Sequence, residues 1–123
     1  MNDLLGELVR CRKWIEDALE YSGGTHDFID IIEAVMRGRM QLWPAEKGCL
    51  VTEIVVYPKK KHIHVFLGGG EMQQILDMHK DVIEWAKGQG CTAATIAGRV
   101  GWKKPLTEYG WTQIHASYIK EFE

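Results

Sequence analysis

A single carboxylate interrupts an otherwise apolar segment near the middle of the chain. Glu53 lies within Cys49–Tyr57, a run rich in β-branched residues that is typical of a strand. A glutamate on a half-buried strand can have a raised pKa, and this suits it to accept a proton from a nucleophile. The alternative is an ordinary strand residue that faces solvent. We therefore take Glu53 as the candidate base, should the protein be an enzyme.

Three consecutive glycines, Gly68–Gly70, join a predicted strand to a predicted helix. The strand is His62–Leu67, and the helix runs from Glu71 to about Lys87 with apolar residues at helical spacing. The glycines permit a tight turn, and the helix start behind them has N–H groups that favour an anion. Glu71 already places a carboxylate at that positive end, where it would repel a second anion. The alternative is a purely structural turn, with Glu71 as an ordinary N-terminal charge.

The histidines and cysteines suggest less chemistry. His62 and His64 are two residues apart on a strand and share one face, which is half of a metal site. His115 is the only further ligand in view, so we expect no metal. His79 falls within the apolar stripe of its helix and is expected at the edge of the core. No serine or cysteine stands in the context of a nucleophile.

Composition limits the partners and the compartment. The 123 residues carry a formal net charge of −2, which argues against a general nucleic-acid binder. The basic run Lys59–Lys61 is interpreted as a solvated hairpin turn. Cys11, Cys49 and Cys91 are odd in number and form no C-x-x-C pair, so buried thiols in a reducing, cytoplasmic compartment are expected. No apolar stretch is long enough to cross a membrane.

The elements that position these residues follow from the periodicity of the sequence, which predicts one α+β domain covering residues 1–123. A helix between the third and fourth strands predicts a right-handed parallel crossover in a mixed, otherwise antiparallel sheet. The predicted helices cover residues 3–20, residues from the cap Thr25 to Gly38, residues 71–87 and a short helix at 102–109. The predicted strands are 40–43, ended by Pro44, then 49–57, 62–67, 92–97 and a last strand, Trp111–Phe122.

This order of elements resembles the GNAT (N-acetyltransferase) superfamily over essentially the whole chain, although no strand precedes the first helix. Three segments carry the likeness: Glu53-Ile-Val-Val-Tyr-Pro58, the Gly68–Gly70 turn before a helix, and Tyr109-Gly110-Trp111 before the last strand. The segment Gly98-Arg99-x-Gly101-Trp102 in so compact a chain is also similar to small GNAT-like proteins encoded by tailed phages and prophages.

The resemblance implies acetyl-CoA as the ligand, a splayed pair of parallel strands for its pantetheine arm, Glu53 as base and Tyr109 as acid. Two positions depart from the family pattern. Val65 stands where an arginine or glutamine belongs, and Leu106 stands where the family tyrosine usually lies. Tyr109 is therefore a displaced acid or a core aromatic. The backbone implied to hold the CoA pyrophosphate is that of Leu67, Gly68, Gly69, Gly70, Glu71 and Met72.

Two functions stay open at this point. The departures favour a GNAT-fold protein with a degenerate acetyl-CoA motif, a non-catalytic phage accessory or virion-associated component in the host cytoplasm or the virion. It would bind an unknown protein partner, with phage structural proteins among the candidates. The alternative is an active acetyl-CoA-dependent N-acetyltransferase acting on an unknown amine. Several tryptophans are available either for the core or as interface anchors, namely Trp43, Trp85, Trp102 and Trp111.

Overall fold

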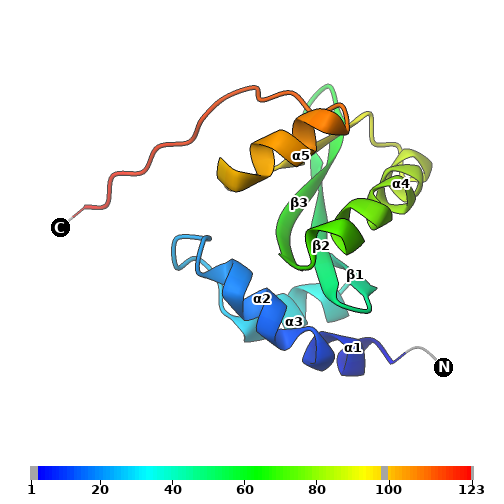
Figure 1. The fold of residues 1–123 in the computed structure, drawn as a ribbon, viewed down its shortest axis with the longest axis vertical. Helices are drawn as coiled ribbons and strands as arrows, with labels where there is room; N and C mark the ends of the chain where they lie inside the picture. The colour runs from blue at the N-terminus through cyan, green and yellow to red at the C-terminus, as the bar shows by residue number, and fades with distance from the viewer. Residues whose placement is uncertain (1–2, 98–99, 123) are drawn as a thin grey trace.

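The computed structural model of the chain describes residues 3–97 and 100–122 (Figure 1). The helices are α1 (Leu4–Arg10), α2 (Arg12–Leu19), α3 (Phe28–Met36), α4 (Met72–Gly88) and α5 (Lys103–Glu108), with a 3-10 turn, η1 (Val100–Trp102), before α5. The strands are β1 (Gln41–Ala45), β2 (Gly48–Val56), β3 (Lys61–Gly70) and β4 (Ala93–Ile96).

The strands form one mixed sheet in the order β1-β2-β3-β4. β1, β2 and β3 pair antiparallel, and β4 pairs parallel to β3 after the crossover through α4. The predicted α+β class and the predicted parallel pair are therefore confirmed. A β-bulge between Val51 and Thr52 shifts the register of β2 against β3.

Two hydrophobic clusters cover the two faces of the sheet. One joins α1, α2 and α3 to the sheet and includes Leu8, Ile31 and Val51, all fully buried. The other packs α4 against the opposite face and includes Ile63 and Val82. In Figure 1 the three N-terminal helices and α4 accordingly lie on different sides of β2 and β3. Each face of the sheet thus has its own helical layer.

The N-terminal helices differ from the prediction at their ends. The helix expected over residues 3–20 is interrupted at Cys11, so that α1 packs against α3 while α2 packs mainly on β3. α3 begins after Asp27 and not at Thr25, because Asp27 and Asp30 form a reciprocal capping box. The Thr25 hydroxyl instead donates to the carbonyl of Ser22, 3.1 Å away.

Two strand boundaries were also predicted wrongly. Pro44 lies within β1 and does not end it, because β1 is an edge strand and has a free side where no N–H is needed. The glycines Gly68–Gly70 continue β3, where they pair with Gly48–Leu50. The sharp change of direction occurs only at Gly70, whose φ of +98° favours glycine.

The C-terminal part of the chain holds one confirmed element and one error. The short helix expected over residues 102–109 is present as η1 and α5. The last strand, predicted at Trp111–Phe122, is absent: residues 111–122 form neither helix nor strand, and residues 112–122 are exposed. Figure 1 shows this segment, in red, running away from the rest of the molecule. A strand needs a neighbour to pair with, and among residues 3–97 and 100–122 the segment pairs with no strand.

Candidate functional site

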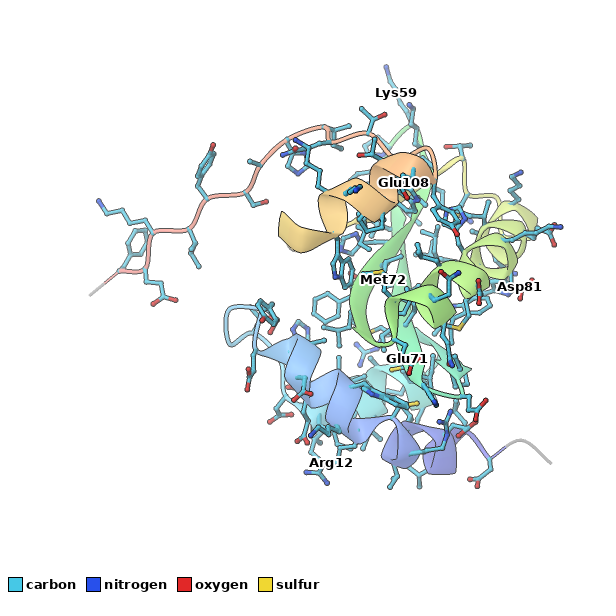
Figure 2. The ribbon with its side chains drawn as sticks, in the orientation of Figure 1. Arg12, Lys59, Glu71, Met72, Asp81 and Glu108 are labelled. Carbon is cyan, nitrogen blue, oxygen red and sulfur yellow. The ribbon has the colours of Figure 1, made fainter. Side chains whose placement is uncertain are left out.

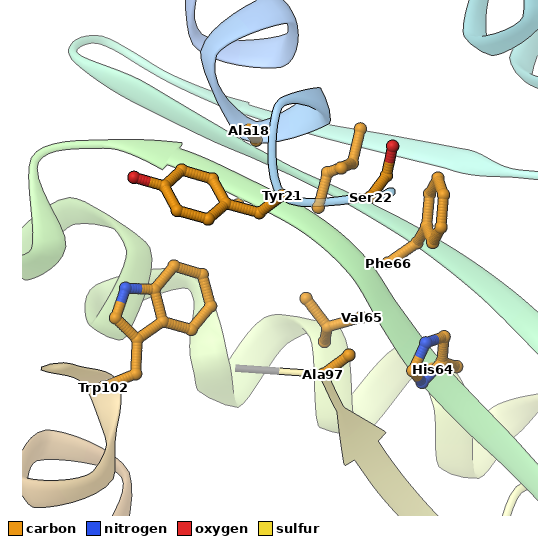
Figure 3. A pocket seen from close by; sticks show the side chains of 10 residues that line it. Ala18, Tyr21, Ser22, His64, Val65, Phe66, Ala97 and Trp102 are labelled. Atoms are coloured by element: carbon orange, nitrogen blue, oxygen red, sulfur yellow. The ribbon is translucent and has the colours of Figure 1, made fainter. Parts of the chain in front are cut away.

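The parallel strands β3 and β4 stay together over only four residue pairs. Pairing runs from His62 with Ala93 to Val65 with Ile96, and β3 then continues alone to Gly70. The resemblance implied two parallel strands that diverge, whereas β4 is paired with β3 along its whole length and ends at Ile96, so the divergence stays a prediction. A pocket of about 230 Å³ lies at that point, between β3 and the end of α2 (Figure 3). Its lining residues are Ala18, Tyr21, Ser22, His64, Val65, Phe66, Leu67, Gly68, Ala97 and Trp102.

His64 is the ionisable side chain with a shifted pKa in this splay pocket. Its Nδ1 lies 2.8 Å from the Thr95 hydroxyl on β4, which fixes the orientation of the ring. Burial lowers the pKa of His64 below its ordinary value, and the Glu53 carboxylate opposes that shift. The imidazole is therefore neutral near pH 7, so it can accept a proton.

Glu53, the predicted base, is half-buried on β2 directly opposite His64. It is not among the residues that line the pocket, so its effect on the pocket passes through the imidazole. The sequence interpretation considered His64 only as half of a metal site. The signal was present nevertheless: a hairpin that closes around Pro58 brings Glu53 and His64 to facing positions.

A second pocket, of about 170 Å³, lies beside the glycine segment at the start of α4. Met72 is the first residue of α4, and helix geometry leaves its N–H without an acceptor inside the helix. An anion is favoured at such a place. The lining residues are Trp14, Asp17, Gly68, Gly69, Gly70, Met72, Ile75 and Trp102, so four of the predicted cofactor-binding residues meet here.

The charges around this helix-start pocket differ from the sequence interpretation. Glu71 lines neither pocket: its N–H donates to the Lys47 carbonyl, and its carboxylate lies 3.9 Å from Lys47 Nζ. Figure 2 marks Glu71 and Met72 at the end of α4 that lies toward the N-terminal helices. The carboxylate that does line the pocket is that of Asp17 on α2. Asp17 is distant in sequence from the glycine segment, and no local pattern pointed to it.

The glycines are required by close packing. A Cβ added to Gly69 would lie 2.7 Å from the Trp14 carbonyl oxygen, and one added to Gly68 would lie 2.9 Å from the Trp102 ring. Glycine therefore lets α2 and Trp102 approach the backbone of β3. Trp102 lines both pockets and lies at their junction. In Figure 3 Trp102 and Tyr21 occupy one end of the splay pocket and His64 the other.

Tyr109, the predicted acid, lies elsewhere. It ends α5, lines neither pocket and makes an edge-to-face contact with His79 of α4, with ring centroids 5.7 Å apart. Trp111 donates through Nε1 to Nε2 of the same histidine at 3.0 Å. The structure thus brings Glu53 to His64 and the glycines to Met72, but it groups Tyr109 with neither. The acid role of Tyr109 stays a prediction.

The remaining sequence expectations concern metals, thiols and membranes. No group of three metal-ligating side chains occurs among the described residues. Cys11, Cys49 and Cys91 are free and buried, as expected. Lys59 lies at the exposed tip of the β2–β3 hairpin (Figure 2). Within residues 3–97 and 100–122, no helix is both long and apolar enough to span a membrane.

Comparisons with known proteins show which solved structures have a similar fold. No protein-family model matches the sequence, and no curated protein does. A transcriptional regulator from Bacillus halodurans C-125 has a similar structure, with a TM-score of 0.73 and 14% identity over 99% of this chain and 97% of that one. A probable acetyltransferase gives a TM-score of 0.71 and 9% identity over 97% of this chain and 94% of the other.

An aminoglycoside acetyltransferase from an uncultured soil metagenomic sample, solved in complex with sisomicin, is also similar. Its TM-score is 0.64, with 9% identity over 97% of this chain and 91% of that chain. At these identities the likeness establishes the fold alone. Nothing in it bears on a phage origin, which stays a prediction. The mixed sheet with its parallel crossover and its two helical layers is a GNAT-like fold of the kind found in acetyltransferases.

Proposed function

We propose that the protein is an acetyl-CoA-dependent N-acyltransferase in which His64 accepts the proton of the acceptor amine. The observation that carries the proposal is the position of His64: a neutral, oriented imidazole in the pocket where β4 ends and β3 continues alone. This replaces Glu53 as the group that contacts substrate. Glu53 becomes a positioning residue, because its carboxylate acts on the pKa of the imidazole from the neighbouring strand.

The residues present fit an acetyl-CoA donor at the level of the backbone. The N–H of Met72 and the glycine segment would hold the diphosphate at the start of α4, and the splay pocket would receive the acyl end of the pantetheine arm. The Asp17 carboxylate opposes a diphosphate and predicts weak binding. The donor supplies an activated acetyl thioester.

The chain's own contribution is proton removal and exclusion of water. In the tautomer whose Nδ1–H donates to the Thr95 hydroxyl, Nε2 of His64 carries the lone pair that can take a proton. An attacking amine gains a bond to the acyl carbon and loses its proton to Nε2, while the C–S bond of the thioester breaks and the thiolate that leaves takes a proton from solvent. Apolar and aromatic walls, including Val65, Phe66 and Trp102, keep the amine in its neutral form.

A panel of primary amines, with an aminoglycoside among them, and acetyl-CoA provides the test, with free thiol and acetylated product measured together. His64→Gln should lower kcat about 100-fold or more, the usual contribution of a positioned base. His62→Gln is the matched control, since His62 lies on the same strand face but lines neither pocket. Full activity of His64→Gln, or equal losses in both variants, would remove His64 from the reaction.

A non-catalytic GNAT-fold component that binds a protein partner is the second candidate. Two observations favour it: the Trp102 ring packs against Gly68 where the pockets meet, and Asp17 places negative charge in the helix-start pocket. A thermal melt with millimolar acetyl-CoA separates the two. Donor at a hundredfold excess over its Kd stabilises the folded state by about 2.7 kcal/mol. That corresponds to roughly 10 °C in a domain near this size, whereas a shift under about 2 °C favours the binding component.

A further inference from the structure

The sequence of the C-terminal segment 111–122 is typical of a half-buried strand, but the segment is exposed and pairs with no described strand. Ile114, Ala116, Tyr118 and Phe122 alternate with Gln113, His115, Ser117 and Glu121, so an extended chain would have an apolar face and a polar face. The segment contains no glycine or proline. Trp111 and Thr112 at its start, and Ile119 and Lys120 further on, break the alternation. A strand with this sequence is stable when other residues cover its apolar face.

In one copy of the chain that face is uncovered. Ile114, Tyr118 and Phe122 are 73%, 94% and 93% exposed, although most apolar side chains of this size are buried in folded proteins. Among the described residues, the hydrogen bonds that hold the segment lie at its start, where the Trp111 N–H donates to the Leu106 carbonyl and its ring N–H donates to His79. Beyond Trp111 it leaves the body of the molecule (Figure 1).

The sheet has an open edge at β4 that could accept a further strand. In the described part of the chain β4 pairs with β3 on one side only, so its other edge presents unpaired backbone groups. An open edge of this kind is a template for another strand. Each copy therefore carries one unpaired strand-like tail and an open edge at β4. Two copies related by a two-fold axis can pair both tails with both β4 edges. The other edge of each sheet, β1, contains Pro44, which has no N–H to donate to an added strand.

We propose that two copies of this chain form a dimer in which the tail of each, residues 112–122, adds as a strand to the open edge of β4 in the other. The tail does not return to its own edge, because the Trp111 anchor on α4 directs it outward. About eleven extended residues span some 35 Å, which is enough to reach a neighbouring molecule. The added strand lies beside Thr95 and Ala97, so the partner's tail also forms a wall near the splay pocket.

The test compares two double variants of the full chain that add equal charge to opposite faces of the tail. Ile114→Glu with Tyr118→Glu places carboxylates on the apolar face, and Gln113→Glu with Ser117→Glu places them on the polar face. Light scattering coupled to size exclusion, over a dilution series, reports the mass. We expect the unmodified chain and the polar-face variant at twice the 14.1 kDa of one chain. The apolar-face variant should be monomeric, with dimer affinity reduced at least ~100-fold.

Hydrogen exchange shows whether the edge is β4. Amides of Ala93–Ile96 and of the tail should be protected in the dimer and lose protection together in the apolar-face variant, with the far-UV circular dichroism of the rest unchanged. A monomeric unmodified chain overturns the proposal, whether its tail is exposed or protected against its own edge. So does a dimer that survives in both variants, or one whose loss leaves exchange at β4 unaltered.

Discussion

The two pockets beside β3 share Gly68 and Trp102, yet they are built in opposite ways. The splay pocket takes its chemistry from strand register, which sets Glu53, His64 and Thr95 in one row across three strands. The helix-start pocket takes its shape from α2, which approaches the glycines closely and brings the Asp17 carboxylate with it. The first is suited to proton transfer, whereas the second offers an anion only backbone groups against an unfavourable charge. For the proposed acyl transfer, we therefore expect donor binding to limit activity more than proton transfer does.

The largest effect is expected from disrupting the glycine segment Gly68–Gly70, which borders both pockets through Gly68. Gly70→Val places a β-branched residue at a φ of +98°, with its Cβ against the backbone of Lys47 and Gly48. We expect a loss of more than about 3 kcal/mol in the free energy of unfolding, measured by chemical denaturation. Gly88→Ala is the control, because its added Cβ meets no atom within 4 Å and α4 should tolerate it. Similar stability of the two variants would mean that the glycine segment is not a packing constraint.

The role of His64 in the splay pocket can be tested by the pH dependence of the reaction. Burial depresses the pKa of His64 and the Glu53 carboxylate partly restores it, so Glu53→Gln should lower that pKa further. The proposed reaction requires the neutral imidazole. In the kcat/KM profile, the rise from acid pH to the plateau should therefore lie below the ordinary histidine value of about 6.5 and move to still lower pH in the variant. A shift to higher pH, or a profile without histidine titration, would contradict the assignment.

The sequence alone predicted what local periodicity encodes. Helices α3 and α4, the hairpin of β2 and β3, and the parallel β4 follow from apolar spacing and β-branched runs, and each is present near its expected position. The interruption at Cys11 and the start of α3 at Asp27 depend on packing and capping choices between competing residues. The tail was expected as a strand because its alternation is real. Strand formation, however, depends on a partner that the sequence does not specify.

The residues of the candidate site also differ in whether local sequence could predict their positions. Glu53 and His64 meet through a hairpin whose register a sequence can suggest, so their pairing was within reach. Asp17 and Trp102 reach the glycine segment from elements some 50 and 30 residues away in the chain, and only tertiary packing brings them there. Glu71 illustrates the converse, since it is at the helix start as predicted but its carboxylate lies toward Lys47.

The smallest predicted effect decides which carboxylate matters to the helix-start pocket. Asp17→Asn removes the charge that lines the pocket, and at surface dielectric this should strengthen acetyl-CoA binding about two- to fivefold at low salt. Glu71→Gln removes a charge that lies near Lys47 and outside the pocket, so its effect should stay below about twofold. Titration calorimetry at two salt concentrations measures both, and the gain from Asp17→Asn should shrink as salt rises. A larger gain from Glu71→Gln would restore the sequence interpretation, in which Glu71 is the group that repels the diphosphate.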